Sequence, residues 1–184
     1  MKKITKADII AATVGILNKH GVAGVSLKEV AEKLEIKPPS LYNHIKNREE
    51  LLSSVAAFSL ERFYHALLTA SAGVQKKEAL FAMSEAYRKF ALAFPGQYEL
   101  IQRQNYWKNT PAEATSDQIV GLLQKVLASF ALPKEEQIHF IRLMRSYLHG
   151  FSSLTGNNSF QLQEDIEESF LYGLKILFSA LPED

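Results

Sequence analysis

Apolar residues recur every three or four positions along nearly every segment of the chain between glycine and proline breaks. This spacing places the apolar side chains on one face of an α-helix, where they can be buried together. No stretch alternates apolar and polar residues between hairpin turns, as a half-buried strand would. The pattern therefore predicts an all-α protein.

The N-terminal quarter predicts three short helices followed by a longer one. His20-Gly21 ends the first helix, because glycine suits the left-handed position after a helix. Ser26 and Glu29 have the spacing of a capping box, which opens a second helix to about residue 34. Asn47 and Glu50 repeat this signature and begin a helix towards residue 70. The third short helix would lie between these two capped helices.

Five further helices follow in the rest of the sequence. Their ends are marked by Gly73 and by segments that contain proline or several small polar residues. The predicted ranges are 76–94, 97–107, 116–130, 134–154 and 163–181.

The segment from Pro38 to His44 predicts a two-turn helix with a polar outer face. Two prolines suit its first turn, where their missing amide protons have no partner. Leu41 and Ile45 would face inward, and the outer face would carry Lys37, Ser40, Tyr42, Asn43 and His44, next to Lys46 and Arg48. Hydroxyl, amide, imidazole and cationic groups can bind DNA phosphates and base edges, so a helix-turn-helix is predicted. Alternatively, Tyr42 and His44 pack at a helix junction and Lys46 is only a solvated charge.

Composition and charge fit this interpretation without identifying a partner. The 184 residues are 47% hydrophobic and include no cysteine, which suits a reducing cytoplasm. Residues 1–53 carry nine basic and six acidic side chains, a net charge of +3, whereas the remainder has 12 against 14, or −2. A basic segment can bind a polyanion. We find no apolar signal-peptide core and no membrane-length apolar run, and expect a cytoplasmic protein without a membrane partner.

From about residue 5 to residue 52 the sequence resembles the TetR/AcrR family of bacterial transcriptional regulators. The likeness lies in IIAA at 9–12, HGV at 20–22, SLKEVAEKL at 26–34 and PSLYNHIKNREELL at 39–52. It implies DNA contacts from Lys28, Pro39, Ser40, Tyr42, Asn43, His44 and Lys46, with Arg48 as a further candidate. Glu35 stands where many members have a turn glycine, so we expect another turn geometry or some strain there.

The same resemblance implies a function and a division of the chain. Residues 1–47 would form the helix-turn-helix DNA-binding domain, and residues 48–184 a helical ligand-binding and dimerisation domain. The expected protein is a repressor that binds a palindromic operator in double-stranded DNA as a homodimer, and that a small-molecule effector releases. The likeness implies no cofactor.

The C-terminal part carries a weaker likeness to the subgroup with a Trp-His-Gly type C-terminal domain, in YRKFALAFPGQYEL at 87–100 and RSYLHGFSSL at 145–154. Arg145 or Tyr147 stands where that subgroup often has tryptophan. Aromatic walls and a few polar groups could line an effector pocket. The candidates are Phe63, Tyr87, Phe90, Tyr98, Arg103, Tyr106, Trp107, Arg142, Arg145 and His149. If Arg142, Arg145 and His149 line it, an anionic or acyl-bearing effector would fit; otherwise the aromatics are ordinary core and the cations face solvent or the dimer seam.

An apolar stripe in the last predicted helix could form a dimer interface. It comprises Ile166, Phe170, Gly173, Leu174, Leu177 and Phe178. A single short helix in the DNA groove gives little affinity, so we expect the protein to bind DNA as a dimer. The last two helices of each subunit would then form a four-helix bundle at the dimer interface. Packing of the same stripe inside one monomer would explain the pattern equally well.

Two other classes of protein deserve comparison with a regulator. Glu136 and His139 have the spacing of half a di-iron carboxylate motif, but no other histidine has a glutamate three residues earlier. Motifs for zinc proteases, nucleophile elbows and phosphate loops are also absent from the sequence. We therefore expect no enzyme and no bound metal. A helical adaptor that binds proteins and never DNA is the second alternative.

Overall fold

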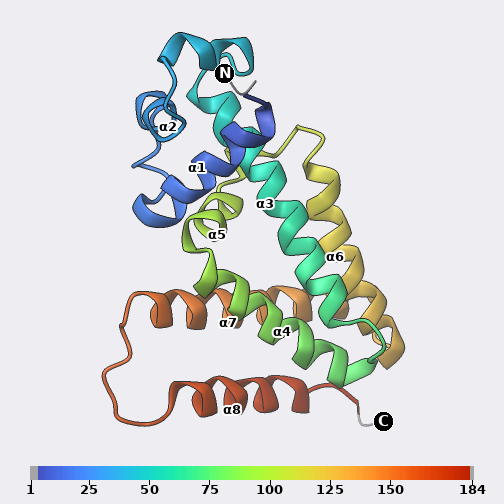
Figure 1. The fold of residues 1–184 in the computed structure, drawn as a ribbon. Helices are drawn as coiled ribbons and strands as arrows, with labels where there is room; N and C mark the ends of the chain where they lie inside the picture. The colour runs from blue at the N-terminus through green and yellow to red at the C-terminus, as the bar shows by residue number, and fades with distance from the viewer. Residues whose placement is uncertain (1–3, 183–184) are drawn as a thin grey trace. The chain divides into compact units, whose positions relative to one another are not determined.

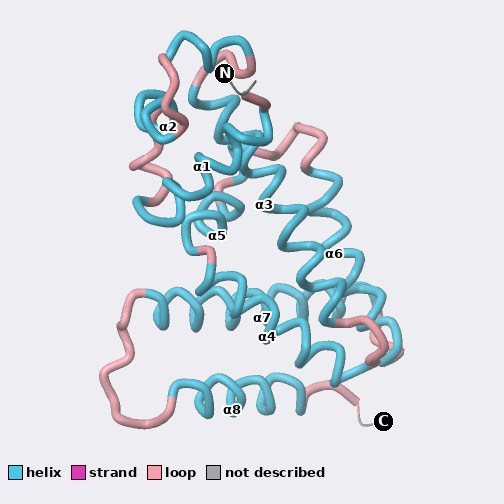
Figure 2. The backbone as a smooth tube through the Cα atoms, viewed as in Figure 1, coloured by secondary structure: helices cyan, strands magenta, loops and turns pink. Residues whose placement is uncertain are grey.

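The structure is a computed structural model, in which residues 4–182 are described (Figure 1). Within that range every regular element is a helix, which confirms the predicted all-α fold (Figure 2). The elements are α1 (Lys6–His20), α2 (Leu27–Lys33), η1 (Pro38–Asn43), α3 (Arg48–Ala70), α4 (Lys76–Ala93), α5 (Pro95–Gln102), η2 (Gln104–Tyr106), α6 (Glu113–Leu127), η3 (Ala128–Phe130), α7 (Lys134–Gly156) and α8 (Ile166–Ser179); the η elements are 3-10 helices.

The described chain divides into two compact units that each combine separate segments. The first, called here the head unit, contains the residues up to Arg62 together with Phe94–Thr115. The second, called the body unit, contains Phe63–Ala93 and the residues from Ser116 onward. Helix α3 contributes to both, so packing divides the chain at other places than after residue 47.

Short-range polar bonds fix the helix starts of the head unit. Thr5 and Asp8 form a reciprocal capping box at α1, and Ser26 and Glu29 form the predicted one at α2. Helix α1 ends at Gly21 as the sequence predicted, but with a φ of 66° and a ψ of −177° this glycine adopts another positive-φ conformation than the expected left-handed helical one.

The cap of α3 corrects one detail of the prediction. Asn47 does accept the amide of Glu50, at 2.8 Å. However, the Glu50 carboxylate accepts the amide of Lys46 at 2.7 Å, one residue before the cap. The same carboxylate lies 3.9 Å from the Lys6 ammonium of α1, so the start of α3 also contacts α1.

Helix α5 packs tightly on α1 within the head unit. A Cβ at Gly96 would lie 2.0 Å from the carbonyl oxygen of Leu17, so only glycine allows this approach. The amide of Gln97 donates to Asn18 Oδ1 at 3.1 Å. Through these contacts, a segment far along the chain becomes part of the same compact unit as the helix-turn-helix.

The body unit is held together by aromatic rings. Helix α4 packs on α7, and α7 and α8 lie side by side, joined by residues 157–165 (Figure 1). The ring contacts form three groups: Phe63 with Tyr87 and Phe90; Phe178 with Phe81 and Phe140; and Phe151 with Tyr147, Phe160 and Phe170. None of the described helices is long and apolar enough to span a membrane.

Candidate nucleic-acid interface

The predicted reading helix is a 3-10 helix, η1, rather than an α-helix. Pro38 and Pro39 occupy its first positions, and its bonds run three residues back, from the Ser40 amide to Lys37 and from the His44 amide to Leu41. A proline has no amide N–H to donate, so this short element has few backbone hydrogen bonds of its own to stabilise it. Tertiary packing must therefore hold it in place.

Two buried side chains anchor η1 as the sequence predicted. Leu41 is fully buried and Ile45 is 2% exposed. They lie in the core of the head unit with Val30 and Ala31 of α2, both of which are also fully buried. Leu34, which the periodicity placed in this core, is only half-buried.

The opposite side of η1 carries most of the candidate DNA-contacting residues. The exposed residues on it and beside it are Lys37, Pro39, Ser40, Tyr42, Asn43 and Lys46, and His44 is half-buried. Tyr42 is 58% exposed, which contradicts the alternative that it packs inside a helix junction. Lys28, near the start of α2, is also exposed and lies 3.8 Å from Glu32. An exposed ion pair of this kind is weak and leaves the lysine able to bind a phosphate.

Arg48 occupies a different environment from the other candidates. Its Nε donates to the carbonyl oxygen of Val25 at 2.7 Å, and its Nη2 donates to that of Val22 at 2.6 Å. The guanidinium is therefore engaged by the backbone turn between α1 and α2. These bonds use two of the five N–H donors of the guanidinium, so contact between Arg48 and a phosphate stays a prediction.

Glu35 confirms the strain expected at the turn between α2 and η1. Its φ is 55°, in the left-handed region that residues with a Cβ rarely adopt. Glu35 thus adopts a backbone conformation that is usual for glycine, although it carries a side chain. The backbone bonds that surround it are Glu35 N to Glu32 O at 3.1 Å and Ile36 N to Ala31 O at 3.0 Å.

The effector candidates are divided between the two units. Tyr98 and Trp107 are buried in the head unit, and the Trp107 Nε1 donates to the carbonyl oxygen of Ile101 at 2.9 Å. Tyr106 is half-buried, and Arg103 is exposed, with its Nη2 2.5 Å from Glu99 Oε1. In the head unit these residues are accounted for by packing and by one surface ion pair.

In the body unit, Phe63, Tyr87 and Phe90 do lie together. Each is less than 10% exposed, with ring centroids 5.2 Å apart for Phe63 and Tyr87 and 5.1 Å apart for Phe63 and Phe90. By contrast, Arg142, Arg145 and His149 are exposed on α7. The structure therefore places the cationic stripe on the exposed surface of α7.

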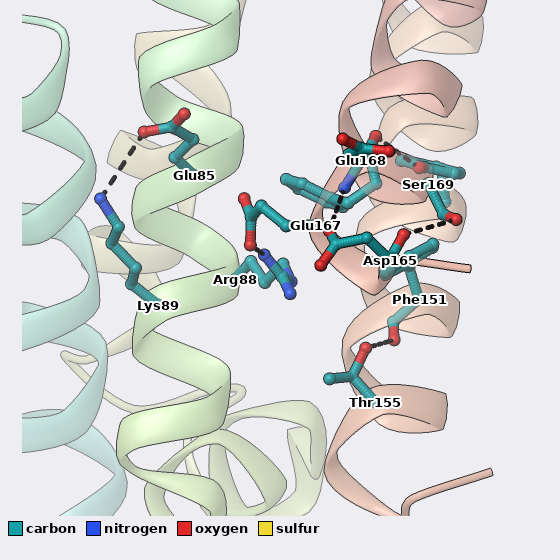
Figure 3. A network of polar contacts seen from close by, with 11 residues as sticks. Glu85, Arg88, Lys89, Phe151, Thr155, Asp165, Glu167, Glu168 and Ser169 are labelled. Atoms are coloured by element: carbon teal, nitrogen blue, oxygen red, sulfur yellow. Dashed lines mark hydrogen bonds and ion pairs between the residues drawn. The ribbon is translucent and has the colours of Figure 1, made fainter. Parts of the chain in front are cut away.

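Arg88 is the polar centre of the body unit, and sequence reasoning missed it. Its side chain is only 13% exposed and forms an ion pair with Glu167 of α8 (Figure 3). It also lies over the Phe170 ring, with its Cζ 4.7 Å from the ring centroid. Tyr147 nearby donates to the carbonyl oxygen of Phe170 at 2.8 Å. Burial raises the pKa of Tyr147, and the positive charge of Arg88 lowers it in part. In sequence, Arg88 is simply one basic residue of an amphipathic helix, so no local signal could have found it.

The predicted dimer stripe of α8 is largely core of the monomer. Phe170 and Leu174 are fully buried and Phe178 is 2% exposed, which corrects their assignment to an intersubunit surface. Gly173 lies against the Tyr147 ring, since a Cβ there would meet Tyr147 Oη at 2.2 Å. Ile166 and Leu177 are half-buried. The outward side of α7 and α8 carries a second apolar set: Leu143, Tyr172 and Ile176, which are 53%, 68% and 59% exposed.

The candidate metal motif of Glu136 and His139 lies on α7. Among the described residues no group of three or more histidine, cysteine, aspartate or glutamate side chains could hold a metal ion. His139 Nε2 lies 3.8 Å from Glu135 Oε1, and both side chains are mostly exposed.

Comparisons with known proteins agree with this geometry. Residues 9–55 match the model for bacterial regulatory proteins of the tetR family, and residues 80–177 match that for a tetracyclin repressor-like C-terminal domain. The HTH-type transcriptional regulator YobS of Bacillus subtilis is 34% identical over 179 residues, which cover 97% of this chain and 93% of YobS. SCO7222, a TetR from Streptomyces coelicolor, superimposes with a TM-score of 0.75 at 18% identity, over 96% of this chain and 97% of that one. BioQ bound to its double-stranded DNA operator does so with 0.66 at 24% identity, over 96% and 97%.

Proposed function

Because this chain belongs to the TetR family of bacterial DNA-binding transcriptional regulators, which are not enzymes, we propose that it is a repressor that binds a palindromic operator as a homodimer. A small-molecule effector would release it. The observation that carries the proposal is the polar, exposed side of η1 opposite its buried anchors Leu41 and Ile45. A repressor with this role acts in the cytoplasm, where the operator lies.

Residues 1–47 are the proposed DNA-binding domain, and η1 is the element that enters the major groove. Lys28, Lys37 and Lys46 would bind phosphates, since exposed lysines supply charge without fixed geometry. Tyr42, Asn43 and His44 would contact base edges or sugars. Pro39 and Ser40 would pack against the sugar-phosphate backbone of the DNA. BioQ, which shares the fold, has been solved on its DNA operator, and this supports the same mode of binding.

Residues 48–184 are the proposed ligand-binding and dimerisation domain. The exposed apolar residues Leu143, Tyr172 and Ile176 of α7 and α8 would pack against a second copy, with Arg142 at the edge of this surface. A two-fold dimer presents two copies of η1 to half-sites about 34 Å apart. The ring group of Phe63, Tyr87 and Phe90 is the proposed apolar wall of the effector site.

Release would follow from a change in the spacing of the two reading elements. An effector that binds one conformation more tightly shifts the population towards it. Helix α3 is the proposed lever, because its 23 residues run from the head unit into the body unit. In the effector-bound conformation the two η1 elements would no longer fit both half-sites.

The test is binding of the purified protein to the DNA upstream of its own gene, measured by fluorescence anisotropy over a range of salt concentrations. Tyr42→Ala and Lys46→Ala should both weaken binding, and Lys46→Ala should lower the salt slope by about 1. Lys125→Ala, which removes an exposed lysine of α6, is the matched control and should bind like wild type. If wild type shows no salt-dependent affinity for this DNA, a protein-binding adaptor becomes the better interpretation.

A further inference from the structure

We propose that Arg48 and Glu99 are positioning residues for operator binding, which hold the turn between α1 and α2 and thereby fix the direction of η1. They would act without contacting DNA. The inference rests on the proposed role of η1, and it assigns a function to two side chains that the DNA-contacting set does not need.

Both side chains bind the same residue of the turn, Val22. The amide of Val22 donates to Glu99 Oε2 at 3.2 Å, and its carbonyl oxygen accepts from Arg48 Nη2 at 2.6 Å. Arg48 Nε reaches the carbonyl oxygen of Val25 at 2.7 Å. Val22 is 2% exposed and Val25 is 1% exposed, so solvent has little access to these residues. The Val22 carbonyl also accepts the Val25 amide, at a longer 3.4 Å. Buried backbone groups without a partner are costly, so the Val22 amide and the Val25 carbonyl in particular gain from these two side chains.

Arg48 connects the two ends of the helix-turn-helix. It is the first residue of α3, four positions after His44, and its carbonyl partner Val25 comes two positions before the start of α2. Its planar guanidinium presents two N–H groups in a fixed fork, so it sets a direction as well as a distance. Since η1 is a short 3-10 helix, its orientation must come from the elements at its ends and from its buried anchors.

Glu99 ties the turn to α5. Its Oε1 accepts from Arg103 at 2.5 Å, which keeps the other oxygen directed at the turn. Gly21, with its φ of 66°, lies beside it, and a Cβ at that position would be 3.1 Å from Glu99 Oε2. Residue 99 belongs to the C-terminal family match at 80–177, yet it packs in the head unit. A shift of α5 would therefore act directly on the turn that Arg48 holds.

Charge makes positioning distinguishable from contact with DNA. If Arg48 bound a phosphate, Arg48→Lys would keep most of the affinity, and Arg48→Ala would lower the salt slope by about 1. If it positions the turn, lysine cannot replace the fork, and both variants should lose about tenfold or more in affinity while the salt slope stays that of wild type.

Variants of Glu99 separate positioning from a purely electrostatic effect more sharply than variants of Arg48. Removing a negative charge should by electrostatics alone strengthen DNA binding. Positioning predicts the opposite, a weakening of about fivefold or more for Glu99→Ala. Glu99→Gln keeps an oxygen that can accept the Val22 amide and should bind like wild type. Glu61→Ala removes an exposed glutamate from the same unit and is the matched control.

The experiment measures operator affinity and salt slope for wild type, Lys46→Ala and these variants, with thermal unfolding of each protein in parallel. Weaker binding by Arg48→Lys and Glu99→Ala at an unchanged salt slope supports the inference. Wild-type affinity in Arg48→Lys, or unchanged or tighter binding by Glu99→Ala, overturns it while the proposed function stands. Absence of binding by wild type overturns the proposed function and, with it, any part of Arg48 and Glu99 in DNA binding.

Should Arg48→Lys unfold, the Glu99 variants decide alone. The Glu99 side chain is 39% exposed and the α5 backbone does not depend on it.

Discussion

The head and body units of this chain are stabilised by different kinds of contact. In the head unit, directed hydrogen bonds join side chains to backbone groups: the Asn18 amide oxygen, the Arg48 guanidinium and the Glu99 carboxylate each bind the main chain of another segment. In the body unit, ring contacts predominate, and even the buried Arg88 lies over the Phe170 ring. Directed bonds fix orientation, whereas ring packing mainly fills volume. Under the proposed function, the difference suits a head unit that must match a fixed DNA geometry and a body unit that would bind an effector.

The largest effect should come from the ring packing of the body unit. Phe170 is fully buried and contacts Tyr147, Phe151 and Arg88. Replacing it with alanine leaves a cavity and should lower the free energy of unfolding by about 3–5 kcal/mol. Denaturant unfolding measures this loss. Phe160→Ala, at a position that is 37% exposed, is the control and should cost much less. Equal losses would show that burial of the ring does not hold the body unit.

The close approach of α5 to α1 should give the next largest effect, in the head unit. Gly96→Ala places a Cβ 2.0 Å from the Leu17 carbonyl oxygen, so the two helices must separate. We expect a loss of about 3 kcal/mol and weaker operator binding, because Glu99 moves with α5. Gly121→Ala, in an exposed part of α6 with open space around it, should instead stabilise by about 0.5–1 kcal/mol. A neutral Gly96→Ala would mean that α5 does not depend on this contact.

A smaller effect, dependent on pH, is expected at Tyr147. Its hydroxyl donates to the Phe170 carbonyl at 2.8 Å, so Tyr147→Phe should cost about 1 kcal/mol at neutral pH. Burial raises the pKa of Tyr147 above the ordinary value of 10.0. Above pH 10 the unfolded chain therefore loses this proton before the folded chain does, and stability falls as the pH rises.

Tyr147→Phe should lack this alkaline contribution. The difference in free energy of unfolding between the variant and wild type should therefore be smaller at pH 10.5 than at pH 8. A constant difference across that range would show that the phenol ionises equally in both states.

The smallest effect is expected at Glu35, in the turn before η1. Its φ of 55° is unfavourable for a residue with a Cβ, so Glu35→Gly should stabilise the protein by about 0.5–1 kcal/mol. Glu35→Ala removes the same charge but keeps the Cβ, and should give no gain. Thermal unfolding of the three proteins compares them. A gain for both variants would assign the effect to the charge and not to the backbone.

Much of the local structure could be predicted from the sequence because it depends on neighbours within one helical turn. The Ser26–Glu29 capping box joins residues three apart, and Gly21 ends α1 by its own backbone preference. The buried Leu41 and the exposed Tyr42 likewise follow from helical spacing once η1 exists. Such interactions are complete within a short segment, so spacing and residue type specify them.

The long-range contacts that hold the turn before α2 and the core of the body unit could not be predicted in this way, because the two partners of each contact lie far apart in the sequence. Arg48 binds carbonyls 23 and 26 residues earlier, Glu99 binds an amide 77 residues earlier, and Arg88 pairs with Glu167 across 79 residues. The same holds for Phe170, whose stripe fits a monomer core and a dimer surface equally well until helix packing is known. The sequence by itself determined which faces of the helices are apolar and where most helices begin and end. Only the tertiary structure decided which face meets which, because that choice depends on all the helices packing at once.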